Sequence, residues 1–162
     1  MNYAAIKKTD VANGPGVRVS LFVSGCPHHC PGCFNAETWD FAYGEEFTEA
    51  TLTEILQALA PEYIRGFSLL GGEPLAPENR ETVLKILEAV AEMYPQKDIW
   101  CYTGYVYEQD IQAWIAQGDE TVRKIMEHIH VLVDGPFILA QRNLKLPFRG
   151  SENQRILNLK EM

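Results

Sequence analysis

The stretch VRVSLFVSGCPHHCPGC, residues 17–33, joins an apolar segment to a loop that holds three of the four cysteines of the chain. Apolar side chains recur at every second position from Val17 to Val23, and a glycine follows, which predicts a β-strand. Glycines and prolines then exclude a regular helix, so the loop can wrap and direct its sulfur atoms inward. The cysteines are Cys26, Cys30 and Cys33, at the carboxyl end of this strand.

Strands and helices alternate along the rest of the chain. The pattern predicts helices over 51–60, 78–94, 108–118 and 119–128, and strands over 66–70, 98–105 and 130–137. The first helix is expected to begin with a capping box formed by Thr51 and Glu54. Such alternation is typical of an α/β protein with a parallel sheet and right-handed crossovers.

The number of strands and the position of the loops suggest where a site lies. Four or five strands are too few to close an eight-stranded barrel, so we expect an open or partial β/α barrel. Active sites in parallel α/β folds form at the carboxyl ends of the strands. The cysteine loop, GGEPL, YTGY and DGPF all stand at such ends, and we expect them to share one rim.

Length and composition are those of one water-soluble domain over residues 1–162. Apolar residues make up 46% of the chain, and no apolar run approaches the ~20 residues that span a bilayer. The segment MNYAAIKKTD has no apolar signal core, so we expect a cytoplasmic protein without a membrane partner. In a reducing compartment the cysteines are better interpreted as metal ligands or buried thiols than as disulfides.

The charge distribution bears on partners. A net charge of −8 argues against nucleic acid, because phosphate binding needs a surplus of Lys and Arg. Residues 141–162 nevertheless carry a local net charge of +3. A solvated basic tail is the simpler interpretation, and a docking or anion-binding segment is the alternative. Arg18 stands on the face of the first strand opposite its apolar side chains, where we expect a salt bridge, with a role near the site as the alternative.

Three kinds of metal site are compatible with the cysteine loop. A zinc site needs a fourth ligand, which His28 or His29 could supply, but adjacent ligands on so short a loop strain tetrahedral geometry. Both histidines are therefore interpreted as loop residues. Cys101 could close an electron-transfer cluster, although its apolar strand is typical of a buried free thiol. An iron–sulfur cube takes one thiolate per iron, so three cysteines leave one iron open to a substrate.

The two motifs together resemble a known superfamily. The spacing C-x3-C-x2-C after a first strand, with GGEP after a later one, resembles the radical S-adenosylmethionine superfamily. NGPGVR, Asn13 to Arg18, is similar to a segment of the glycyl-radical-enzyme activases. More fully, the chain resembles the anaerobic ribonucleoside-triphosphate reductase-activating proteins, in order and over almost its whole length, through GCPHHCPGCFN, GGEPL, DIWCYTGY, VLVDGPF and FRGSENQR. Gly32 departs from the superfamily pattern, which usually has an aromatic residue there.

The resemblance implies an oxidoreductase with a partial β/α barrel of the radical S-adenosylmethionine type. It implies a 4Fe-4S cluster held by Cys26, Cys30 and Cys33, whose open iron binds S-adenosylmethionine. One electron splits that molecule into methionine and a 5'-deoxyadenosyl radical, which takes a hydrogen atom from a glycine of the anaerobic ribonucleoside-triphosphate reductase. It also implies a low-potential electron donor, such as flavodoxin or ferredoxin, and is compatible with a homodimer.

Further residues acquire roles from the same resemblance. In GGEP, Gly71, Gly72, Glu73 and Pro74 are implied to contact the methionine amino group; the glycines let the backbone approach the ligand, and the proline fixes the exit of the turn. An ordinary strand-to-helix turn is the alternative. No catalytic residue is implied beyond the cluster and the bound S-adenosylmethionine.

Three more positions are candidates for cofactor binding. Asn35 is expected to hydrogen-bond to the bound ligand. Thr103 and Asp134 stand where related activases bind S-adenosylmethionine or a cation, and turn capping is the alternative for both. The functions left open are activation of another glycyl radical enzyme, a radical enzyme acting on a small molecule, such as a carboxydeazaguanine synthase, an electron carrier, and a zinc-binding interaction module.

Overall fold

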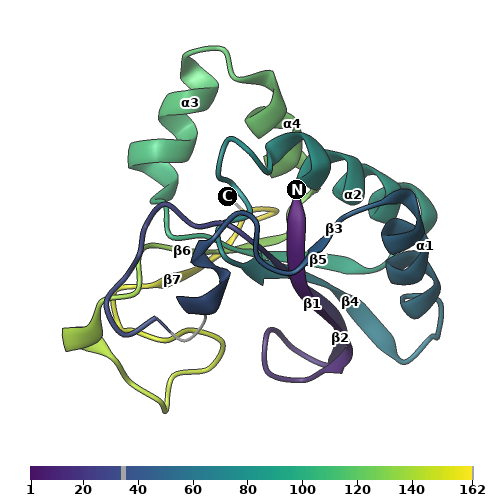
Figure 1. The fold of residues 1–162 in the computed structure, drawn as a ribbon, viewed down its shortest axis with the longest axis horizontal. Helices are drawn as coiled ribbons and strands as arrows, with labels where there is room; N and C mark the ends of the chain where they lie inside the picture. The colour runs from purple at the N-terminus through teal and green to yellow at the C-terminus, as the bar shows by residue number, and fades with distance from the viewer. Residues whose placement is uncertain (34–35, 162) are drawn as a thin grey trace.

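A computed structural model describes residues 1–33 and 36–161 and is built around one seven-stranded mixed sheet (Figure 1). The strand order across the sheet is β3-β1-β2-β4-β5-β6-β7. The strands are β1 (Asn2–Asp10), β2 (Val17–Val23), β3 (Glu45–Glu46), β4 (Ile64–Gly71), β5 (Asp98–Tyr102), β6 (Val131–Asp134) and β7 (Arg155–Asn158).

The four central strands confirm an α/β fold. Strands β2, β4, β5 and β6 pair in parallel, in the order in which they occur in the sequence. The α-helices lie between them in the chain and are α1 (Glu49–Ala58), α2 (Arg80–Met93), α3 (Gln112–Ala116) and α4 (Glu120–His128). The sheet is open, with β3 and β7 at its edges. The curvature of a radical S-adenosylmethionine barrel stays a prediction.

The expectation of a parallel sheet was wrong at both edges. Strand β1 runs antiparallel to β2 and β3, and β7 runs antiparallel to β6. Only residues 11–16 connect β1 to β2, and a parallel pair needs a crossover of a dozen or more residues. Alternation of strands and helices predicts the direction of a strand only where an α-helix connects it to its neighbour. In the part of the chain that the structure describes, no α-helix lies between β1 and β2, or between β6 and β7.

Short turns complete the secondary structure. They are the 3-10 turns η1 (Ala36–Trp39) and η3 (Leu139–Gln141) and the π-helical turn η2 (Tyr107–Ile111), which leads into α3. The predicted capping box of Thr51 and Glu54 was wrong by three residues: Thr48 is the N-cap of α1, and its backbone N–H donates to Thr51 Oγ1 at 3.1 Å. No helix of the described residues is long and apolar enough to cross a bilayer.

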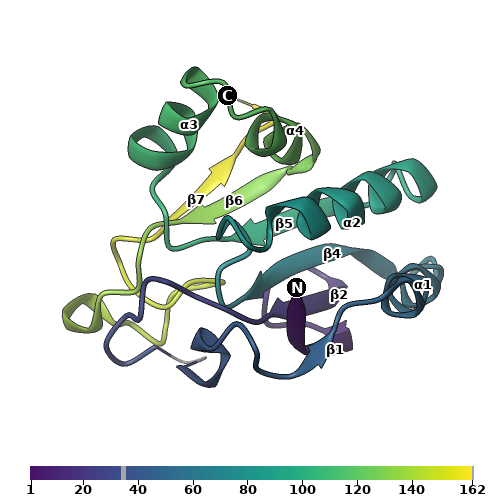
Figure 2. The same ribbon diagram turned by 45° about the horizontal axis from the view of Figure 1, so that its top comes forward.

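The two faces of the sheet differ in what covers them. The helices cover one face, where apolar side chains of the central strands pack against them in the main core (Figure 2). The opposite face is more polar, and it includes the fully buried side chains of Arg18, Ser20 and Ser68. Loops rather than helices cover that face. Because successive residues of a strand point to opposite faces, each central strand contributes to both environments.

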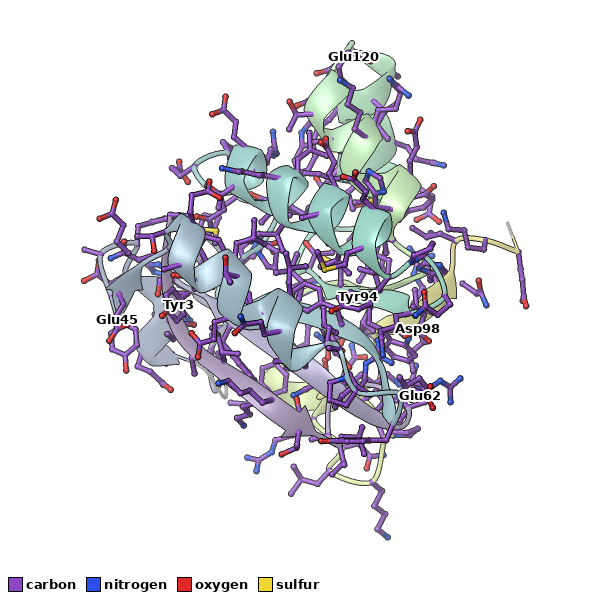
Figure 3. The ribbon with its side chains drawn as sticks, turned by 90° about the vertical axis from the view of Figure 1, so that its right-hand side faces the viewer. Tyr3, Glu45, Glu62, Tyr94, Asp98 and Glu120 are labelled. Carbon is purple, nitrogen blue, oxygen red and sulfur yellow. The ribbon has the colours of Figure 1, made fainter. Side chains whose placement is uncertain are left out.

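Arg18 is the largest buried polar side chain on the loop-covered face. Its Nη2 atom lies 2.6 Å from Oδ1 of Asp98, which stands at the start of β5 beside the end of α2 (Figure 3). Its Nε donates to Ser68 Oγ at 2.7 Å, and the guanidinium lies over the Trp100 ring. Burial lowers the pKa of Arg18, and the Asp98 carboxylate opposes that shift. The salt bridge expected for Arg18 is thus confirmed.

Removing the carboxylate of Asp98 should destabilise the fold. In Asp98→Ala the Arg18 charge stays fully buried without its ionic partner, and we expect the free energy of unfolding to fall by about 3 kcal/mol. Arg65→Ala is the matched control, because the exposed Arg65 lies 3.8 Å from the same carboxylate; it should cost less than about 1 kcal/mol. Urea denaturation measures both changes. Equal losses in the two variants would contradict the assignment.

Candidate functional site

Loops from four parallel strands line one cavity of about 340 Å³. The cysteine loop follows β2, GGEP follows β4, Thr103 and Gly104 follow β5, and Gly135 follows β6. The four loops that were expected to share one rim therefore do so, at the carboxyl ends of the parallel strands. The cavity brings together these predicted site residues: Cys26, Cys30, Cys33, Gly71, Gly72, Glu73 and Thr103.

Two of the described residues that were predicted for the site, Pro74 and Asp134, are not among those that line the cavity. Asn35 lies outside the described residues. Asp134 is buried, and its carboxylate accepts hydrogen bonds from Arg155 Nε at 3.0 Å and from the Tyr107 backbone N–H at 2.9 Å. This arrangement corresponds to the turn-stabilising alternative for Asp134; its cofactor-binding role stays a prediction.

Backbone hydrogen bonds fix the start of the cysteine loop. The Gly25 N–H donates to the Thr38 carbonyl at 2.6 Å, and the Cys26 N–H donates to the Trp39 carbonyl at 3.1 Å. Gly25 has a φ of +95°, which lets the chain turn away from β2 at this point. Cys26 is consequently held in place and buried, while Cys30 and Cys33 are half-buried.

Two thiols of the loop lie in a desolvating environment. Burial raises the pKa of Cys26 to about 11 and raises that of Cys30. A positively charged centre would stabilise the thiolates that serve as ligands. Among the described residues, no three His, Cys, Asp or Glu side chains are grouped to hold one metal ion. A cluster does not need such convergence, because each thiolate binds its own iron.

Cys101 lies on the other side of the sheet. Its side chain is fully buried in the core between the sheet and the helices, where burial raises its pKa well above the usual value. The next residue, Tyr102, lines the cavity. Since neighbouring residues of a strand point to opposite faces, the Cys101 thiol points away from the other three.

The two glycines of GGEP allow the ends of β4 and β2 to meet. A Cβ atom on Gly71 would lie 2.3 Å from the Val23 carbonyl oxygen, and one on Gly72 would lie 2.7 Å from the Gly25 carbonyl oxygen. Gly71 also has a φ of +139°. The close approach that the structure shows is to the base of the cysteine loop; an approach of the same glycines to a bound ligand stays a prediction.

The carboxylate of Glu73 is fully buried and accepts four hydrogen bonds. Oε1 accepts from His28 Nε2 and from the Gly104 N–H, both at 2.7 Å. Oε2 accepts from the Thr103 hydroxyl at 2.8 Å and from the Leu75 N–H at 2.9 Å. An ionised carboxylate offers about four lone-pair sites, so these donors use its capacity. The side chain of Glu73 connects three loops of the rim to one another.

The cavity also includes residues that the sequence did not single out as site residues. Phe148 and Arg149 belong to FRGSENQR and line the cavity, and so does Asn13 from NGPGVR. Phe148 has a φ of +60°, a strained value for an aromatic residue that is often found at functional sites. The Nε atom of Arg149 is buried without a hydrogen-bond partner among the described residues. FRGSENQR and NGPGVR both carry the family resemblance, and this resemblance was the signal in the sequence that could have identified their residues as part of the site.

Comparison with known proteins identifies the family. A family model described as a 4Fe-4S single cluster domain matches residues 12–157. The anaerobic ribonucleoside-triphosphate reductase-activating protein of Escherichia coli K12 is 40% identical over 162 residues, covering 99% of this chain and 100% of the relative. The chain belongs to the anaerobic ribonucleoside-triphosphate reductase-activating protein family. The family model and the cysteines of the chain support an iron–sulfur cluster.

Two more members of this activating-protein family show that the similarity is not confined to a segment. The relative from Vibrio cholerae is 42% identical over 158 residues, with 96% of this chain and 97% of the relative covered. The relative from Enterobacteria phage T4 is 40% identical over 158 residues, with 96% and 93% covered. Both carry the same name as the Escherichia coli protein. The resemblance found in the motifs is therefore confirmed over nearly the full length.

Adding a side chain at Gly72 should disturb the cysteine loop. In Gly72→Val the new side chain meets the carbonyl oxygens of Val23 and Gly25, and we expect a loss of about 2 kcal/mol in stability and less iron bound after anaerobic reconstitution. Gly118→Ala is the control, because it has a φ of +99° but nothing within 4 Å of its Cβ position. It should cost about 1 kcal/mol and leave the iron content unchanged. Wild-type iron binding by Gly72→Val would contradict the packing role of Gly72.

Proposed function

We propose that the protein activates an anaerobic ribonucleoside-triphosphate reductase by radical chemistry that starts from S-adenosylmethionine. One observation carries the proposal: three thiols of one loop line a cavity from which the fourth cysteine points away. A cube held by three cysteines keeps one iron free for a substrate. A closed electron-transfer cluster would need a fourth ligand, and Cys101 lies on the wrong face of the sheet to supply it.

The residues of the site fit the cluster and its co-substrate. Cys26, Cys30 and Cys33 would hold a 4Fe-4S cluster at the cavity wall. When bound, the cluster supplies one electron, which breaks the sulfonium–C5' bond of S-adenosylmethionine and gives methionine and a 5'-deoxyadenosyl radical. That radical takes a hydrogen atom from a glycine Cα, which gives 5'-deoxyadenosine and a glycyl radical.

The contribution of GGEP to ligand binding would then come mainly from its backbone. All the acceptor sites of the Glu73 carboxylate are used within the protein, so its side chain has little capacity left for the methionine amino group. Backbone groups of Gly71 and Gly72 line the same cavity and carry no side chains that would cover them. The Thr103 hydroxyl also donates to Glu73, so any contact of Thr103 with S-adenosylmethionine stays a prediction.

The partner is proposed from the relatives. Each is named as the activating protein of an anaerobic ribonucleoside-triphosphate reductase, and the similarity extends over at least 93% of each of the three relatives compared above. We therefore propose that the glycine belongs to such a reductase and that residues 1–162 act as one domain. A low-potential donor such as flavodoxin or ferredoxin would supply the electron, and a homodimer is compatible with this scheme.

The three loop cysteines and Cys101 should behave differently on substitution. Changing Cys26, Cys30 or Cys33 to Ala should abolish the cluster, while Cys101→Ser should retain about four iron atoms per chain. Iron analysis and visible absorbance after anaerobic reconstitution measure the difference. Thermal unfolding serves as the control for folding, because Cys101 is fully buried. A Cys30→Ala protein with wild-type iron content would show that the assigned ligands are wrong.

Radical transfer to the reductase tests the whole proposal. The reduced protein, S-adenosylmethionine and the reductase should together give the doublet of a glycyl radical in electron paramagnetic resonance. Deuteration of the glycine Cα should collapse the splitting and place deuterium in 5'-deoxyadenosine. Omitting the reductase should remove the signal. If no radical forms on the reductase and a small molecule is consumed instead, the protein is a radical enzyme of another class.

A further inference from the structure

His28 stands between two cysteines of the loop and is held on several sides. Its Nε2 donates to Glu73 Oε1 at 2.7 Å, and the side chain is only 17% exposed. The Tyr105 ring meets it edge to face, with 4.4 Å between ring centroids. A Cβ atom on Gly104 would lie 2.5 Å from the imidazole, so this ring position requires a glycine there. The imidazole of His28 is therefore closely packed and does not lie on an open surface.

The acceptor of this hydrogen bond is itself immobilised. Glu73 is fully buried, and its other three hydrogen bonds come from Leu75, Thr103 and Gly104. Its backbone N–H also donates to the Gly25 carbonyl at 2.7 Å. A residue hydrogen-bonded to Glu73 is thus tied to the ends of three strands at once.

His29 provides an internal comparison. It is the next residue, but it is exposed and stacks on Trp39, with 4.6 Å between centroids and 6° between ring planes. It has a φ of +48°. The stacking on Trp39 and the turn account for the position of its ring. The two histidines differ in burial and in their connection to Glu73.

We propose that His28 is a positioning residue, which fixes the loop between Cys26 and Cys30 through Glu73 so that the thiols present the cluster to the cavity in one orientation. The inference rests on the proposed function, because it assumes a cluster on these thiols. His28 lies two residues from each of the two cysteines, so anchoring its ring restricts the chain on both sides. The GGEP turn then acts on the cluster through a side-chain hydrogen bond as well as through its backbone.

Four single variants separate this role from general destabilisation. His28→Ala removes the donor, His28→Gln keeps an amide N–H at similar reach, and His28→Asn has a donor one methylene shorter. His29→Asn is the matched control, because Asn tolerates a positive φ. Each reconstituted protein is treated with an iron chelator, and iron release is followed. The reduced cluster is also examined by electron paramagnetic resonance with and without S-adenosylmethionine, and apo-protein melting reports on folding.

The expected pattern follows from the loss of one hydrogen bond to a buried side chain, which should change a rate roughly tenfold. His28→Ala and His28→Asn should release iron about tenfold faster and show altered spectra on adding S-adenosylmethionine. His28→Gln and His29→Asn should stay within about twofold of wild type. In a double-mutant cycle, His28→Ala should add little to Glu73→Ala, because that variant already removes the acceptor of the His28 hydrogen bond.

Two results would overturn the inference. Wild-type release and spectra in His28→Ala would show that the hydrogen bond does not position the cluster. Equal effects in His28→Ala, His28→Gln and His29→Asn would show that the loop responds to any change rather than to loss of the bond to Glu73. If the wild-type protein itself forms no cluster, the proposed function fails instead, so the two failures are distinguishable.

Discussion

The close contact between the ends of β2 and β4 is the constraint on which the site depends. Gly71 and Gly72 have no side chains, so the GGEP backbone lies directly against the carbonyl groups of Val23 and Gly25. The Glu73 N–H then donates to the Gly25 carbonyl, one residue before the first cysteine. The cysteine loop and the GGEP turn are therefore one packed unit, and a shift of either backbone would move the other.

The side chain of Glu73 connects this unit to the loop that follows β5. A buried carboxylate is costly unless donors compensate it, and here donors from the cysteine loop, the GGEP turn and the end of β5 do so. The same hydrogen bonds connect three loops of the rim through one acidic side chain. It orders the loops before any ligand binds, and ordering in advance reduces the entropy that binding must otherwise remove.

The unequal faces of the sheet separate the cysteines into two groups. Apolar side chains face the helices and hold Cys101 in the core, whereas Tyr102 and the loop thiols face the cavity. The ion pair of the buried Arg18 and the half-buried Asp98 lies on the loop-covered side, where Arg18 also donates a hydrogen bond to Ser68. One strand, β5, thus places the buried thiol of Cys101 on one face and the cavity residue Tyr102 on the other.

The sequence by itself determined the α/β class, the loops that form the rim and the family, because periodicity, turn residues and motif spacing are local properties of the chain. The separation of Cys101 from the other thiols also followed from its apolar strand. Only the tertiary structure decided the antiparallel edges, because the direction of β1 and β7 depends on how short or irregular connections return to the sheet. It alone also decided the partners of Glu73, His28 and Asp134, since these hydrogen bonds join residues 21 to 45 positions apart, whose meeting depends on strand order.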